Sequence, residues 1–195
     1  MAQDADKQTL YLVDGSAFIF RAYHALPTGQ FTNPEGVTVN AVYGFVNMFV
    51  KLLSDMHVKN MAVIFDATRE NFRYDIFPEY KANRGETPED LIPQFPIIRE
   101  ATEAFDLPCL ELEGFEADDL IATYSKRAVE AGWKVVIVSS DKDLMQLVND
   151  DVVMFDPMKG KTMDIAAVHE KFGVSPDKVI DVQSLAGDSV DNVPG

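Results

Sequence analysis

Apolar runs of strand length recur along this chain and restrict its fold more than any other feature. The clearest are Leu10–Val13, Met61–Phe65, Lys134–Val138 and Val152–Phe155, with a further candidate at Pro108–Leu112. A strand that is apolar along nearly its whole length must be buried on both faces, which is typical of parallel sheets covered by helices. The sequence therefore predicts a mostly parallel sheet inside the domain.

Segments with helical spacing lie between these runs. Ala41–Met56 carries apolar residues three and four positions apart, and Ala117–Ala131 repeats the pattern up to Gly132. Ser175 followed by Pro176 predicts the start of a third helix, which reaches about Leu185. We expect an α/β domain of three layers, with a mostly parallel central sheet and helices on both faces.

The stretch 69–93 departs from this alternation. Its basic residues Arg69, Arg73, Lys81 and Arg84 alternate with the aromatic residues Phe72, Tyr74, Phe77 and Tyr80. Cations beside rings suit a single strand of nucleic acid, because cations contact phosphates and rings stack on bases. A solvated excursion with incidental charges is equally compatible, since acidic residues occur among the basic ones. We expect this stretch to be mobile, because nothing in its pattern anchors it to the sheet.

Composition narrows the cellular context. The single cysteine, Cys109, forbids an internal disulfide and favours a reducing compartment. The acidic start Met1–Asp6 lacks the apolar core of a signal peptide, and no apolar run is long enough to span a bilayer. We expect a cytoplasmic protein with no membrane partner. The net charge of −15 disfavours direct contact with a polyanion unless bound cations mediate it.

Acidic residues follow four of the predicted strands. They are Asp14, Asp66, the group Glu116, Asp118 and Asp119, and the pair Asp141 and Asp143; Asp188 and Asp191 form a later pair. The carboxyl ends of parallel strands meet at one edge of a sheet, so the first seven carboxylates should lie together and repel one another. Without a His/Cys cluster, Mg²⁺ or Mn²⁺ fits such a site better than zinc.

Each acid also has an ordinary structural explanation. Asp118 suits a helix cap, Asp141 a loop and Asp14 a turn before Gly15. If the acids do converge, replacing Asp141 or Asp119 with Asn should raise the melting temperature in the absence of metal. Two metal ions held at such a cluster would suit hydrolysis of a phosphodiester.

Six motifs occur in an order that is found in a known family. They are Leu12-Val13-Asp14-Gly15-Ser16, Phe65-Asp66, Tyr80-Lys81-Ala82-Asn83-Arg84, Gly114-Phe115-Glu116-Ala117-Asp118-Asp119, Ser140-Asp141-Lys142-Asp143, and Gly187-Asp188-Ser189-Val190-Asp191-Asn192-Val193-Pro194-Gly195. Across essentially its whole length the chain resembles the 5′-nuclease domains of bacterial DNA polymerases I, which are relatives of flap endonucleases. Each motif is weak alone, and the combination is specific.

The resemblance implies a PIN-like fold and hydrolysis of DNA or RNA primers from the 5′ end, including flaps, with two or more Mg²⁺ or Mn²⁺ ions. The implied metal-binding set is Asp14, Asp66, Glu116, Asp118, Asp119, Asp141, Asp143, Asp188 and Asp191. Lys81 and Arg84 would be catalytic and act on the scissile phosphate, and Tyr80, Arg73 and Arg21 would contact DNA.

The resemblance also implies a domain organisation. Residues 1–186 would form the catalytic domain, with an arch at about 69–93. Residues 187–195 would begin a helix–three-turn–helix motif that grips duplex DNA. The parent chain would carry proofreading and polymerase domains and act at the bacterial nucleoid.

Other classes of protein share single features with this chain. A haloacid-dehalogenase-type phosphatase needs a second acid where Ser16 stands, and a nicotinamide-binding domain needs a glycine-rich fingerprint after the first strand. A PIN-type ribonuclease shares the acidic pocket without the long basic-aromatic insertion. A catalytically inactive cation-binding module remains the alternative outside the enzymes.

Overall fold

The structure is a computed structural model that describes residues 8–56 and 58–195. The expectation about Met1–Asp6 concerns residues outside this range. Six strands form one sheet in the order β3-β2-β1-β4-β5-β6. Their bounds are β1 (Thr9–Asp14), β2 (Met61–Ile64), β3 (Cys109–Leu110), β4 (Lys134–Val138), β5 (Val152–Asp156) and β6 (Lys161–Met163). All neighbouring strands pair in parallel except β5 and β6, so the predicted mostly parallel sheet is confirmed.

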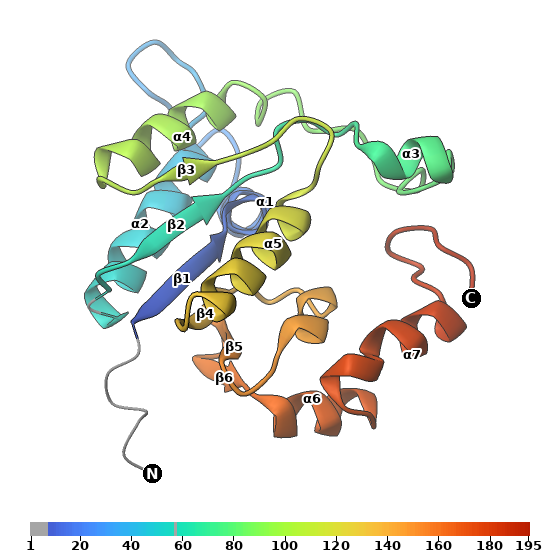
Figure 1. The fold of residues 1–195 in the computed structure, drawn as a ribbon. Helices are drawn as coiled ribbons and strands as arrows, with labels where there is room; N and C mark the ends of the chain where they lie inside the picture. Colours follow the sequence, from blue (N-terminus) through green and yellow to red (C-terminus); the bar gives the residue numbers. More distant parts are fainter. Residues whose placement is uncertain (1–7, 57) are drawn as a thin grey trace.

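Helices cover both faces of this sheet (Figure 1). Their bounds are α1 (Gly15–Ala25), α2 (Asn40–Met56), α3 (Phe72–Ile76), α4 (Gln94–Ala104), α5 (Ala117–Glu130), α6 (Ile165–Phe172) and α7 (Val179–Ala186). The two predicted helices α2 and α5 are confirmed within a residue at each end. The third begins as a 3-10 turn at Pro176–Lys178 and continues as α7. In the described part of the chain no helix combines the length and apolar character needed to cross a membrane.

The strands divide the core into two halves, because successive side chains point to opposite faces. On β1, Leu12 packs in the half covered by α5, α6 and α7, while Val13 packs in the half covered by α1, α2 and α4. The second half is rich in aromatic rings, and Phe45 stacks on Phe49 with a centroid separation of 4.6 Å. The result is the predicted three-layer α/β architecture.

Close contact at the end of β1 requires a glycine. A Cβ on Gly15 would lie 2.4 Å from the ring of Phe65, which follows β2. The backbone can therefore turn directly from β1 into α1 and keep Asp14 at the edge of the sheet.

The segment 69–93 is anchored to the rest of the domain by contacts that its sequence pattern does not reveal, and its mobility stays a prediction. Leu91 is 0% exposed and belongs to the aromatic half of the core, and Tyr80 is 7% exposed. Asn71 caps the short helix α3 by accepting from the N–H of Arg73 at 2.9 Å. Most of its anchors are polar contacts to residues distant in sequence, which leave no periodic pattern.

Candidate active site

Four carboxylates form the centre of the acidic edge, and we call them the inner carboxylates: Asp14, Asp66, Asp118 and Asp141. Asp14 ends β1 and caps α1, accepting from the N–H of Ala17 at 3.0 Å. Its other oxygen accepts from the hydroxyl of Ser139 at 2.8 Å. Because β1 and β4 are neighbours, that hydroxyl also lies within reach of the next acid and accepts from the N–H of Asp141 at 3.0 Å.

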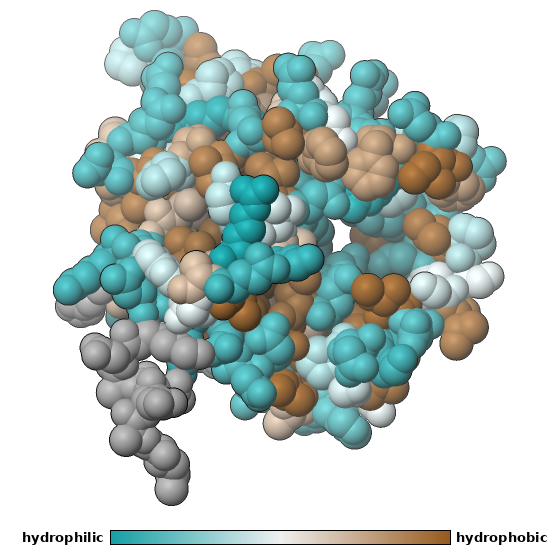
Figure 2. Space-filling view, in the orientation of Figure 1, coloured by the Kyte–Doolittle hydropathy of each residue, from teal (hydrophilic) through white to brown (hydrophobic). Residues whose placement is uncertain are grey.

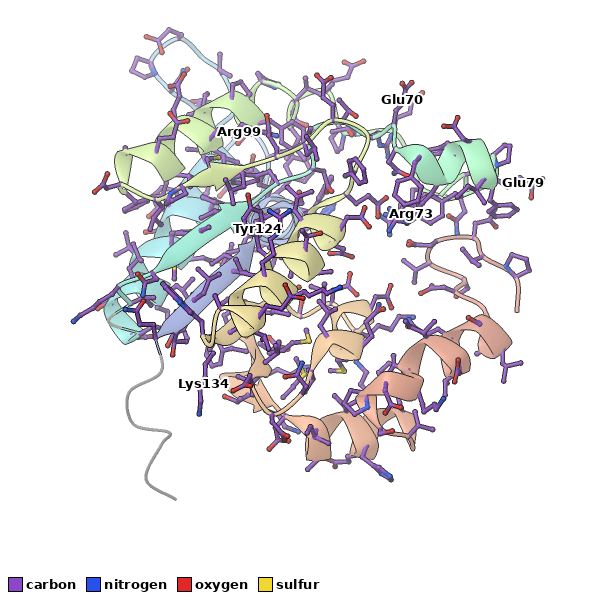
Figure 3. The ribbon with its side chains drawn as sticks, viewed as in Figure 1. Glu70, Arg73, Glu79, Arg99, Tyr124 and Lys134 are labelled. Carbon is purple, nitrogen blue, oxygen red and sulfur yellow. The ribbon has the colours of Figure 1, made fainter. Side chains whose placement is uncertain are left out.

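Asp66 is positioned by three groups on three elements. Its N–H donates to the hydroxyl of Ser16 at 2.9 Å, and its carboxylate accepts from the N–H of Ala117 at 2.7 Å. Its carbonyl accepts from the guanidinium of Arg99 on α4 at 3.0 Å; Figure 3 labels this arginine. These contacts hold the turn after β2 against the first turn of α5, next to Asp118.

Negative charge on the inner carboxylates destabilises the folded protein. Asp14 is 5% exposed, and burial, together with the negative charges of Asp66 and Asp141, raises its pKa to about 6. Burial and the charges of the other inner carboxylates also raise the pKa of Asp118 well above its ordinary value. In the described part of the chain, no Lys or Arg forms an ion pair with any of the four. The negative charges of the inner carboxylates are therefore not neutralised by an ion pair within residues 8–56 and 58–195.

Four further acids around this centre are paired with cations, and we call them the outer carboxylates: Glu116, Asp119, Asp188 and Asp191. Their ion pairs are Lys81–Glu116 at 2.7 Å, Arg73–Glu116 at 3.9 Å, Arg73–Asp119 at 2.7 Å, Lys142–Asp188 at 2.9 Å, Lys81–Asp191 at 3.8 Å and Arg84–Asp191. Figure 3 shows Arg73 lying between α3 and the start of α5. Three of the cations predicted to contact DNA or phosphate, Arg73, Lys81 and Arg84, are thus engaged with predicted metal ligands.

The pKa values of Asp119 and Asp143 are shifted in opposite directions. Burial works to raise the pKa of Asp119, but the two hydrogen bonds from Arg73 and the capping bond from the N–H of Glu116 bring it below its ordinary value. Burial and the nearby charge of Asp141 raise the pKa of Asp143, although the amide of Gln183 donates to it. Asp143 therefore belongs electrostatically with the inner carboxylates.

The donor set fits hard divalent cations, because it offers carboxylate oxygens crowded together without compensating charge. Within residues 8–56 and 58–195, however, no three acidic, His or Cys side chains are arranged to bind one ion together. The outer carboxylates instead face Lys and Arg. The predicted acids share one edge of the domain, but they do not form a closed set of metal ligands in this conformation.

The predicted DNA-contacting residues have different surroundings. The ring of Tyr80 is buried, so it is not open for stacking on a base here, and Arg73 is paired with Asp119. Arg21 is exposed on α1 and takes no part in these ion pairs. Lys81 has a positive φ of 54°, a conformation that costs energy for a residue other than glycine.

A cavity of about 920 Å³ adjoins the acidic edge. Its lining includes Asp66, Lys81 and Glu116 near the carboxylates, the basic residues Arg69, Arg84 and Arg99, and the aromatic residues Phe20, Phe65, Tyr74 and Phe95. The space-filling view shows an opening through the molecule between the body of the domain and the part formed by α3 and the C-terminal segment (Figure 2). Basic and aromatic side chains therefore do line a space beside the acids.

Several supporting residues were missed by the sequence interpretation. They are Ser16, Asn71, Arg99, Ser139 and Gln183, each of which donates to or accepts from a predicted site residue. Ser16 ends the first motif, Ser139 directly precedes the fifth, and both follow strands closely, which is a usable signal. Arg99 and Gln183 sit inside helices and outside the motifs, and their roles follow only from the tertiary structure.

Acids gathered at one edge of a three-layer α/β sheet, beside a basic and aromatic cavity, are typical of metal-dependent nucleases. Comparison with known proteins places the chain more narrowly. Residues 9–173 match the family described as 5′-3′ exonuclease, N-terminal resolvase-like domain. The chain belongs to this family.

Two relatives show how the chain compares in length. It is 56% identical over 193 residues to a DNA polymerase I from Rhizobium leguminosarum, a match that covers 95% of this chain and 19% of the polymerase. It is 41% identical over 188 residues to a 5′-3′ exonuclease from Aquifex aeolicus, covering 96% of this chain and 64% of that protein. The chain thus spans about a fifth of the polymerase.

Solved structures share the fold. A structure of T5 5′-exonuclease with bound divalent metal ions (zinc) superposes with a TM-score of 0.76 at 26% identity, covering 96% of this chain and 70% of the exonuclease. A complex of the bacteriophage T5 flap endonuclease with DNA and metal ions superposes with a TM-score of 0.75 at 24% identity, covering 96% and 70% of the two chains. The PIN-like fold class is therefore confirmed.

Proposed function

We propose that this chain hydrolyses phosphodiester bonds of DNA, and of RNA primers, from 5′ ends and flaps in a reaction that depends on Mg²⁺ or Mn²⁺. The inner carboxylates carry the proposal, because four acids from separate strand ends lie together without a counterion beside a cavity with cationic and aromatic walls. The family supports it, as do the T5 enzymes, one solved with bound zinc ions and one in complex with DNA and metal ions.

The residues take distinct roles in this proposal. Asp14, Asp66, Asp118 and Asp141 hold the cations, assisted by Asp143 and the outer carboxylates. Bound divalent cations would supply the charge that activates water and stabilises the attacking and leaving oxygens.

Lys81 and Arg84 act on the substrate in this proposal. They donate to the oxygens of the scissile phosphate and stabilise the charge that develops there. Both line the cavity, as does Asp66, so a nucleotide in the cavity lies within reach of cations and acids together. The aromatic walls suit unpaired bases, whose faces stack on rings without regard to sequence.

Cleavage of a 5′-labelled flap DNA tests the proposal. The measurement uses enzyme in excess at low salt, with Mg²⁺, Mn²⁺ or EDTA, so that weak binding does not limit the rate. Asp118→Asn should slow cleavage by a factor on the order of 10² or more. Asp164→Asn is the matched control, because this exposed acid caps α6 away from the acidic edge.

The alternatives give different outcomes in the same assay. Faster cleavage of single-stranded RNA than of the flap would favour a PIN-type ribonuclease. A chain that binds Mn²⁺ but cleaves neither substrate would be the cation-binding module.

A further inference from the structure

Two segments far apart in sequence are joined across the acidic edge, and we call this junction the clasp: residues 79–84 with residues 188–192. Its bonds run from Lys81 N–H to Asp191 O at 2.8 Å, from Asn83 Nδ2 to Ser189 O at 2.7 Å, from Asn192 Nδ2 to Glu79 O at 2.8 Å, and from Arg84 to the Asp191 carboxylate. In Figure 1 the C-terminal segment curls opposite α3. The clasp thus closes one side of the opening seen in Figure 2.

Two carboxylates meet inside the clasp. The hydroxyl of Tyr80 lies 3.1 Å from an oxygen of Glu116 and 3.1 Å from an oxygen of Asp191. One hydroxyl proton can satisfy only one of them at a time, so two negative charges remain close together. The ammonium of Lys81 lies near both, at 2.7 Å from Glu116 and 3.8 Å from Asp191, and the guanidinium of Arg73 lies farther from Glu116, at 3.9 Å.

The ammonium of Lys81 thus lies beside two carboxylates whose negative charges repel each other. Like charges held together in a partly buried site raise the energy of the fold until a cation neutralises them. The guanidinium of Arg84 adds a second positive charge on Asp191. Among the described residues the inner carboxylates form no ion pair, whereas Glu116 and Asp191 are both paired with cations of the clasp.

We infer that Lys81 and Arg84 serve as built-in counterions of Glu116 and Asp191, that a divalent cation competes with them for these two carboxylates, and that metal binding opens the clasp. This inference rests on the proposed metal-dependent function. Opening frees both cationic side chains for the substrate phosphate, so the protein exposes its phosphate-binding groups only when metal is present. It also relieves the backbone of Lys81, whose positive φ is held by its bond to Asp191.

The inference requires a coupling that can be measured in both directions. If the closed clasp keeps the carboxylates of Glu116 and Asp191 from the metal, only molecules with an open clasp bind it fully. The apparent metal affinity is then the intrinsic affinity multiplied by the fraction of molecules that are open. Removing a built-in counterion must then raise the affinity, and adding metal must loosen the clasp by the same free energy.

Mn²⁺ titration of the 195-residue protein by calorimetry tests the first direction. Arg84→Gln and Lys81→Gln should bind Mn²⁺ about tenfold more tightly than the wild type, within the usual range of coupling between sites. Arg69→Gln is the matched control. It also removes one positive charge from this segment, but its guanidinium donates to the carbonyl of Gly85 and not to a carboxylate. The side chain of Arg84 is 44% exposed, so its replacement leaves the core intact.

Hydrogen exchange of the wild type tests the second direction. Saturating Mg²⁺ should speed exchange in a peptide that contains the Lys81 N–H by about tenfold, whereas a peptide from the middle of α5 should keep its rate. Equal Mn²⁺ affinities of all three variants, or unchanged exchange around Lys81 in a protein that binds Mg²⁺, would overturn the clasp and leave the proposed function standing. Failure of the wild type and every variant to bind metal would overturn both.

Discussion

Replacing Asp14 with Asn measures what the inner carboxylates cost the metal-free fold. Burial raises the pKa of Asp14 from 3.8 to about 6, so its ionised form is less stable in the folded protein than in the unfolded chain. The difference between these two values corresponds to about 3 kcal/mol of lost stability at neutral pH. Asn removes the charge and keeps the shape.

Part of this gain is offset by hydrogen bonding. The Asn oxygen can still accept from the N–H of Ala17, but the bond from the hydroxyl of Ser139 is lost, at about 1 kcal/mol. The net gain is about 2 kcal/mol, which for a domain of this size raises the melting temperature by about 4–8 °C.

The pH dependence has a definite sign. Because the folded pKa is the higher one, the wild-type carboxyl contributes its full stability below pH 3.8 and loses it as the pH rises through about 6. The advantage of Asp14→Asn should therefore be absent near pH 4 and complete above pH 7.

Thermal denaturation in EDTA, followed by circular dichroism from pH 4 to pH 8, is the assay. Asp164→Asn is the control: it also accepts from an N–H three residues on at 3.0 Å, but it is exposed. It should change the melting temperature little at any pH. If Asp14→Asn melts at or below the wild-type temperature at pH 7.5, or gains equally at pH 4, the charge-crowding argument is wrong.

Three further predictions concern other parts of the site. Asp119→Asn should lower the stability in EDTA by about 1–2 kcal/mol in urea denaturation, because it breaks the paired hydrogen bonds from Arg73; unchanged stability would contradict this. Lys81→Ala should slow single-turnover flap cleavage by a factor on the order of 10², and a normal rate would remove it from the mechanism. Gly15→Ala should cost about 1–3 kcal/mol, since its methyl group meets the ring of Phe65; a variant as stable as the wild type would refute the packing argument.

The sheet was predictable because each parallel strand depends on a local apolar run. Strand β6 was missed because its three residues Lys161–Met163 are mostly exposed and pair antiparallel at the edge. Helix α6 was also missed, although Asp164 caps its start and Gly173 ends it with a φ of 73°. Those two residues are a standard pair of helix boundary signals, so this miss was avoidable.

The acidic residues of the site were predictable from the sequence, but the cations with which they form ion pairs were not. The motifs selected nine carboxylates, and the convergence of acids at the strand ends led to the expectation that Asn at position 119 or 141 would stabilise the metal-free fold. The structure changes that expectation for Asp119, whose partner Arg73 lies 46 residues earlier in the chain. Asp141 forms no ion pair with any described Lys or Arg, and for it the original expectation stays a prediction.

The net charge of −15 is compatible with a nucleic-acid substrate because the acids divide into inner carboxylates without ion pairs and outer carboxylates paired with cations. A uniformly acidic surface would repel DNA at every approach, and scattered cations would be screened within about 10 Å. Here the positive groups Arg73, Lys81 and Arg84 are gathered at one edge, but they are paired with outer carboxylates as long as no metal competes. The metal ions that neutralise the inner carboxylates would then also release these positive side chains for contact with the substrate. Catalysis and the electrostatic attraction of the substrate would therefore both depend on metal binding.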